Sequence, residues 1–246
     1  FLIAYNVNIR KEKIYELDTT IAIKEESNPF FTSNTSLVFN WGGTSDQVQS
    51  LASTLKSRSH NEVVVDRLDF YLDYLKKGKY YLRDVYGLTP FKVIIDKDKP
   101  QLLKSLISIK FISETEYELK VNFEGDNAHT FVYRMNSASP VGVSTGTFKK
   151  RFKFNEHTNL PFLNIKLERA DFFGNFIGQE FFIKFNRFDD TVSKYRNIKT
   201  GIDKNALSII RLSLEGTNKN RLVAYLNETV KTIIKAQLDR KNQFAT

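Results

Sequence analysis

Apolar residues recur at helical spacing near the C-terminal end of the chain. Leu222, Leu226 and Val230 follow one another at steps of four, and Ile233 and Ile234 come three and four residues after Val230. This spacing places their side chains on one face of a helix. The Thr-Asn pair before the run supplies good N-cap side chains, and neither Gly nor Pro interrupts residues 217–246. The pattern therefore predicts one long helix.

That helix would be about 45 Å long at a rise of about 1.5 Å per residue, which exceeds the width of a small domain. We therefore expect its first half to lie on a domain and its second half to project and meet another helix. The residues expected to pack against the domain or against a second copy are Leu222, Leu226, Val230, Ile233 and Lys235.

Two strands are predicted to join this helix in one base domain. Residues 14–23 alternate between apolar and polar positions, and residues 206–214 form a strongly apolar strand. Helical spacing also predicts a helix pair, one helix at residues 47–58 and a second that begins from a cap at Ser59 or Asn61. We expect the two strand–helix pieces to share one sheet, with the helices packed on one of its faces.

Between these pieces the pattern changes to a period of two residues. In residues 117–121 (YELKV) apolar side chains occupy every second position, which is typical of a strand with one buried face. Turn residues such as Gly125-Asp126-Asn127 recur at the spacing of a β-sandwich or barrel. The strands predicted here are residues 80–86, 91–95, 106–112, 117–123, 129–133, 146–154, 160–167 and 176–188.

The predicted fold class is α+β: a base domain with a long C-terminal helix, and an inserted all-β module that is sandwich-like or barrel-like. The predicted divisions are 1–69 and 189–216 for the two halves of the base domain, 70–188 for the β module and 217–246 for the projecting helix. The apolar residues 1–5 are either a buried start or the end of a transmembrane helix.

The amino-acid composition excludes some kinds of functional site and leaves others open. The chain has no cysteine, which excludes disulfides and thiolate metal sites. Its net charge is +9, but 28 acidic residues are interspersed among 37 basic ones. Two interpretations stay open: a lysine-rich soluble surface, and attraction to an anionic polymer or to lipid headgroups.

No arrangement of residues predicts a reaction centre. His60, His129 and His157 lack the spacing of a zinc motif. No Walker-type phosphate loop is present. Residues 142–146 (GVSTG) have the order Gly-x-Ser-x-Gly, but they lie at the edge of a predicted strand or hairpin, whereas a nucleophile elbow turns from a strand into a helix. Adjacent acids such as Asp189-Asp190 do not establish the cleft that a glycosidase needs. We therefore expect no catalytic residue, no cofactor, no metal and no nucleic-acid partner.

Two groups of residues are candidates for contact with a glycan. Phe30, Phe31 and Trp41 lie in a polar segment, where aromatic rings either anchor a loop or offer a stacking surface for sugars. Lys149 and Arg151 fall on the same side of a predicted basic strand. That strand has either one solvated face or a face for an anionic glycan or partner.

Several segments together resemble the Wzz-type polysaccharide co-polymerases, or chain-length determinants. Residues 45–70 are similar to the helix pair of that family, with Leu-Lys-Ser-Arg-Ser followed by a Val-rich helix. Residues 86–93 (YGLTPFKV) are similar to the Tyr-x-x-x-Pro-Phe-x-Val step of Bacteroidetes members. Residues 209–242 resemble the closing strand and helix, although Asn218-Lys219 stands where the family usually has a Pro.

The resemblance implies the periplasmic part of a protein anchored in the inner membrane. Such proteins assemble into homo-oligomeric rings, often octamers, and control the chain length or export of capsular polysaccharide, exopolysaccharide or O-antigen. Their implied partners are the polysaccharide, its polymerase and an outer-membrane exporter. Many Bacteroidetes members continue into a cytoplasmic tyrosine autokinase. These residues carry none of its Walker motifs, so they leave open whether the parent protein is an enzyme.

Two other functions stay open beside the ring-forming regulator. One is a glycan-binding or glycan-cleaving β module on a membrane stalk, for which Phe30, Phe31, Trp41 and residues 70–188 are the relevant features. The other is a periplasmic adaptor of an export complex. The resemblance specifies neither the polymer nor the number of subunits.

Overall fold

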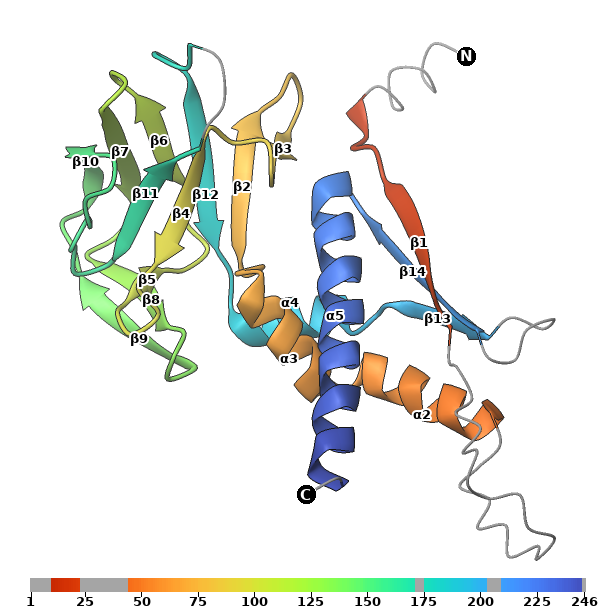
Figure 1. Ribbon diagram of the computed structural model, residues 1–246. Helices are drawn as coiled ribbons and strands as arrows, with labels where there is room; N and C mark the ends of the chain where they lie inside the picture. Colours follow the sequence, from red (N-terminus) through yellow and green to blue (C-terminus); the bar gives the residue numbers. More distant parts are fainter. Residues whose placement is uncertain (1–9, 23–43, 171–174, 203–208, 245–246) are drawn as a thin grey trace, which may run out of the picture. The chain divides into compact units, whose positions relative to one another are not determined.

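The structure is a computed structural model that describes residues 10–22, 44–170, 175–202 and 209–244 (Figure 1). The chain divides into two compact units. Unit 1 comprises residues 1–14 and 69–191, and unit 2 comprises residues 15–68 and 192–246. The predicted four-part division of the chain, with an inserted module at 70–188, stays a prediction.

The predicted α+β class is wrong, because the part of the chain that the structure describes is mostly β, with fourteen strands against four helices. The prediction treated two strand–helix pieces as the body of the fold. It missed strands β2, β5, β9 and β13, at Leu72–Lys77, Gln101–Leu102, Ser137–Gly142 and Lys199–Ile202. Strand β9 (SASPVG) is exposed along most of its length and has no apolar alternation that a sequence pattern could detect. A long C-terminal helix beside a β region is therefore only part of the description.

Unit 1 is built around a six-stranded antiparallel sheet with the order β10-β7-β6-β12-β2-β3. Two smaller sheets, β11-β4 and β5-β8-β9, complete it. Its further strands are β3 (Leu82–Asp84), β4 (Phe91–Ile95), β6 (Ile107–Phe111), β7 (Glu116–Phe123), β8 (Asn127–Val132), β10 (Gly146–Lys153), β11 (Ile165–Arg169) and β12 (Glu180–Phe185).

The core of unit 1 is aromatic. On β7 every second side chain is buried, beginning with Tyr117, as the period of two predicts. The ring of Phe111 lies 6.0 Å from that of Phe91 and 5.0 Å from that of Phe154, and Phe181 packs edge-on against Phe91 at 5.7 Å. Aromatic pairs at these separations add stabilisation beyond the apolar area that they bury.

A buried amide connects the irregular segments of unit 1. Gln101 is fully buried, and its Nε2 donates to the carbonyl oxygens of Asp96 and Asn164, both at 2.8 Å. In the other direction, the backbone N–H of Asn164 donates to Gln101 Oε1 at 3.1 Å. These bonds satisfy backbone groups where the sheets offer no ladder partner.

Unit 2 holds a three-stranded antiparallel sheet in the order β1-β14-β13. Strand β1 (Tyr15–Ala22) pairs along its whole length with β14 (Ile209–Gly216), from Tyr15 opposite Gly216 to Ala22 opposite Ile209. Helix α5 (Lys219–Phe244) contacts both strands and also α3 (Arg58–Arg67), while α2 (Thr44–Lys56) contacts α3 and β14. The shared sheet that the sequence predicts is therefore present.

The helix boundaries follow from their caps. Asn218 Oδ1 accepts the backbone N–H of Arg221 at 3.1 Å, which makes Asn218 the cap of α5. Helix α3 is capped by Ser57, whose hydroxyl accepts the N–H of His60 at 3.2 Å, and not by Ser59 or Asn61. The short helix α4 (Phe188–Tyr195) carries the chain from unit 1 into unit 2.

Asn61 serves as a buried polar link between α3 and α5 instead. Its Nδ2 donates to the carbonyl oxygens of Leu55 at 2.9 Å and Ser57 at 2.7 Å, and its Oδ1 accepts the hydroxyl of Tyr225. The ring of Tyr225 also stacks on Tyr195 at 4.6 Å. Because both Asn61 and Tyr225 are fully buried, this contact fixes how α5 is rotated against α3.

We predict that Tyr225→Phe destabilises unit 2 by about 1–3 kcal/mol, because Asn61 Oδ1 loses its donor inside the protein. Urea denaturation followed by circular dichroism measures the change. Tyr80→Phe, at an exposed tyrosine of unit 1, is the control and should change stability by less than about 0.5 kcal/mol. Equal stability of the two variants would contradict the role of the link.

A second prediction concerns pH. Burial lowers the pKa of His60 below its usual value of 6.5, and its Nε2 has no hydrogen-bond partner among the residues that the structure describes. The unfolded chain therefore binds this proton more readily, so unit 2 loses stability as the pH falls below about 6.5. Denaturation at pH 7, 6 and 5 should show a smaller loss for His60→Leu than for the wild type. His129→Leu, at an exposed histidine of unit 1, is the control for removing one histidine.

Candidate functional site: the outward face of helix α5

Helix α5 presents one apolar face to the interior of unit 2. Leu222, Leu226 and Ile233 are buried there, and Val230 is half-buried at the border of this face. Lys235 is exposed. The apolar residues proposed from the sequence as oligomer contacts are therefore largely used by the fold of unit 2 itself, and Lys235 lies beside them in solvent.

A second apolar stripe runs along the outward side of the same helix. Val223, Ile234 and Leu238 are 47%, 51% and 54% exposed, and half-buried Val230 continues the line. At 3.6 residues per turn these four positions fall within an arc of about 80° and extend over about 22 Å of helix. We name Val223, Val230, Ile234 and Leu238 the outward stripe.

This stripe was not predicted from the sequence, because Ile234 was assigned to the same face as the buried Ile233. Neighbouring positions are about 100° apart on a helix, so they cannot both lie at the centre of one narrow face. The available signal was the separate series 223, 230, 234 and 238, whose steps of seven and four also match helical spacing.

Charged residues of both signs flank the outward stripe. Lys231 and Lys235 are exposed on one side, and Asp239 is exposed farther along the helix. Glu228 accepts from Arg67 of α3 at 2.9 Å and lies 3.9 Å from Lys231 Nζ. An apolar centre with a charged margin is the usual organisation of a surface that docks another protein.

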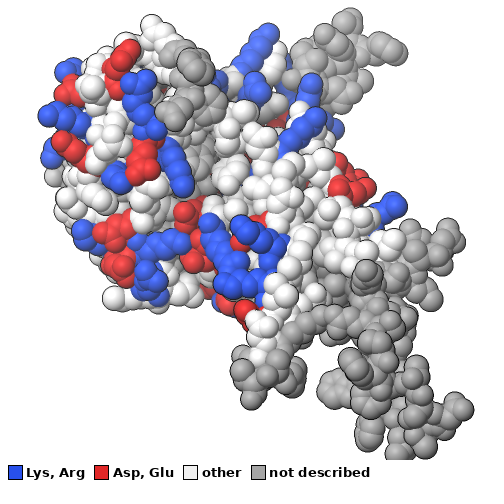
Figure 2. All heavy atoms as spheres, in the orientation of Figure 1, with Lys and Arg blue, Asp and Glu red and all other residues white. Residues whose placement is uncertain are grey.

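The basic strand β10 lies in a mixed environment. Lys149 Nζ is 3.0 Å from a carboxylate oxygen of Glu118, and Arg151 stands opposite Glu118 in the strand register. Lysine, arginine and acidic side chains also adjoin one another on the face of unit 1 that Figure 2 shows. The other glycan candidates, Phe30, Phe31 and Trp41, lie outside the described residues.

Across the parts of the chain that the structure describes, no three His, Asp or Glu side chains gather as metal ligands. Over the same residues, no helix has both the length and the apolarity required to cross a bilayer. No protein-family model matches the chain, and no curated protein matches it. The similarity to Wzz-type proteins therefore stays a resemblance carried by the sequence segments named above.

The two faces of α5 predict opposite responses to the same substitution. Leu226→Ala should destabilise unit 2 by about 2–5 kcal/mol because it leaves a cavity in the core. Leu238→Ala should change stability by less than about 0.5 kcal/mol in the isolated chain, because Leu238 is 54% exposed and no core closes over it. Denaturant midpoints of the two variants measure the difference. A large loss for Leu238→Ala in a monomeric sample would show that the outward stripe belongs to the internal core.

Proposed function

We propose that this chain is the non-catalytic periplasmic part of a polysaccharide co-polymerase. In this proposal it assembles with copies of itself into a ring at the inner membrane and controls the chain length or export of a capsular polysaccharide or exopolysaccharide. The observation that carries the proposal is the outward stripe of α5, which unit 2 leaves half-exposed after its own core is formed.

A second copy of the chain is the occupant that we assign to this stripe. In a ring, each copy covers the outward stripe of its neighbour with a different part of its own surface, so the same head-to-tail contact repeats around the ring. Burying exposed Ile and Leu side chains there stabilises association by about 25 cal/mol per Å² of apolar surface. The flanking Lys231, Lys235 and Asp239 allow neighbouring copies to pair opposite charges. Ring assembly is also what the resemblance of residues 45–70 and 209–242 implies.

A ring gives this scaffold a way to influence polymer length without breaking bonds. Each copy presents the same surfaces, so a growing polysaccharide meets several equivalent contacts at once. Multivalent attachment strengthens as more contacts are engaged, because each further contact forms within one assembly. A chain long enough to reach several copies is then retained longer than a short one, which links polymer length to release.

The test uses the full protein in its own membrane. A photo-crosslinking amino acid at position 234 should capture a second copy of the chain and produce a ladder of multiples of its mass. The variant Ile234→Asp/Leu238→Asp should lose the ladder formed by a probe at position 223, and the polysaccharide should lose its characteristic length distribution. The loss of the ladder and the change in polymer length are both expected because an unpaired aspartate is costly to bury, so the charged stripe cannot pack against a second copy.

The control is Glu124→Ser, which changes an exposed charged residue of unit 1 and leaves helix α5 unaltered. It should keep both the ladder and the polymer length. A ladder that disappears without any change in polymer length would contradict the proposed function. A ladder formed only with a different protein would favour the export adaptor.

A further inference from the structure

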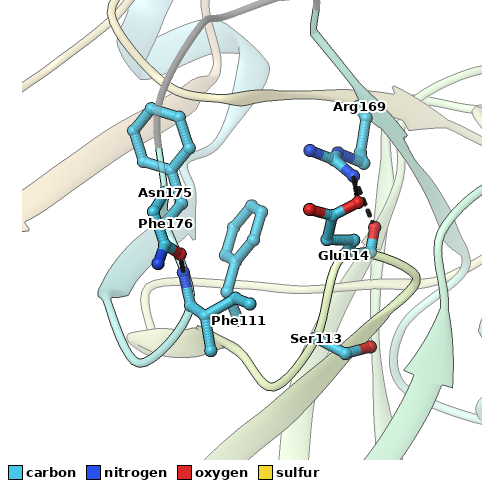
Figure 3. Close-up of a pocket in the computed structure, with 7 residues that line it drawn as sticks. Phe111, Ser113, Glu114, Arg169, Asn175 and Phe176 are labelled. Carbon is cyan, nitrogen blue, oxygen red and sulfur yellow. Dashed lines mark hydrogen bonds and ion pairs between the residues drawn. The ribbon is translucent and has the colours of Figure 1, made fainter.

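Unit 1 contains a hollow that self-association through α5 does not use (Figure 3). It lies between the β6–β7 turn, which supplies Ser113 and Glu114, and the segment of residues 175–177 that leads into β12. Phe111 forms its floor and Arg169 its far wall. The cavity volume is about 320 Å³, which is at the lower end of the range for small-ligand sites, and the cavity opens to solvent.

One side of the hollow is apolar and held in place. The ring of Phe176 lies 6.2 Å from the ring of Phe111, and Ile177 presents a half-exposed aliphatic side chain beside it. The N–H of Ile177 donates to Asn175 Oδ1 at 3.0 Å. The following N–H, from Gly178, donates to the carbonyl oxygen of Phe111 at 2.8 Å. This wall is therefore anchored to β6 by backbone hydrogen bonds.

The opposite side carries a positioned positive charge. Arg169 Nη1 donates to the backbone carbonyl oxygen of Glu114 at 2.7 Å, which orients the guanidinium. The Glu114 carboxylate is 3.9 Å from the same nitrogen, too far for a hydrogen bond, and its side chain is 79% exposed. An arginine has five N–H donors, and the Glu114 carbonyl uses only one of them. The guanidinium therefore has further N–H donors for a planar anion such as a ligand carboxylate.

The guanidinium of Arg169 and the apolar wall opposite it together favour a ligand that carries an anionic group on a ring. A carboxylate fits the guanidinium fork, and an aromatic ring with a neighbouring aliphatic group covers the apolar face of a pyranose. A neutral sugar would leave the positive charge without a new partner, and a small free acid would leave Phe176 uncovered. Because the hollow opens to solvent, it can hold one sugar residue while the rest of a longer saccharide lies outside it.

We propose that this hollow binds a uronic acid residue of a polysaccharide, with its carboxylate on Arg169 and its ring against Phe176. The preference for a saccharide over other carboxylates rests on the proposed function. Each copy in the ring then contributes one such site. Glu114 is an internal competitor, because its carboxylate lies beside the guanidinium that the ligand uses.

The experiment is calorimetric titration of the full chain with trigalacturonate, with maltotriose as the neutral trisaccharide and propionate as a bare carboxylate. Trigalacturonate should bind at least about tenfold more tightly than maltotriose, which lacks the charge-assisted hydrogen bond to Arg169. It should bind several-fold more tightly than propionate, which lacks the ring that covers Phe176. Arg169→Gln should weaken binding about tenfold or more, and Phe176→Leu should weaken it several-fold. Glu114→Gln should strengthen binding, because it removes the competing charge and keeps the backbone carbonyl that orients Arg169.

Arg134→Gln is the matched control, since Arg134 is an exposed arginine of unit 1 paired with Asp98 at 3.1 Å. It should leave binding unchanged. Equal affinity for maltotriose or propionate, or undiminished binding by Arg169→Gln, overturns the proposed site. A chain that forms the photo-crosslinked ladder but does not bind trigalacturonate overturns the site and leaves the ring proposal standing. Binding of trigalacturonate by a chain that forms no ladder overturns the ring proposal and leaves the site standing.

Discussion

The pairing of β1 with β14 is the constraint on which unit 2 depends. It brings residues from opposite parts of the chain into one ladder, and it sets the strand from which α5 continues. Buried contacts of Leu226 and Tyr225 then fix the rotation of the helix about its axis. Once that rotation is fixed, Ile234 and Leu238 must face outward, because a helix cannot bury two stripes against one layer. The candidate association surface is thus a consequence of the fold.

Features that depend on residues close together in the sequence were predicted correctly. The cap at Asn218, the uninterrupted helix after it and the alternation of β7 all follow from neighbouring residues. The α+β class was wrong because edge strands such as β9, which bury little, have no apolar period to detect. The hollow was not predictable, since Glu114, Arg169 and Phe176 become neighbours only through the pairing of distant strands.

The two candidate surfaces belong to different units and make different demands on the chain. The outward stripe needs apolar side chains at helical spacing and tolerates exchange among them. The hollow needs one arginine with a fixed orientation, which the Glu114 carbonyl provides, and an aromatic wall. In the account proposed here, self-association multiplies a weak saccharide site, and multivalency converts its repeats into retention of long chains. Neither surface requires a catalytic group.

The central claim is that the outward stripe of α5 is covered by another copy of this chain. Native mass spectrometry of the full protein, released from its membrane in mild detergent, tests it most directly. The account predicts one dominant species whose mass is a fixed multiple of the chain and which persists on dilution. A protein that is monomeric at every concentration, with its native polysaccharide still of controlled length, would contradict it.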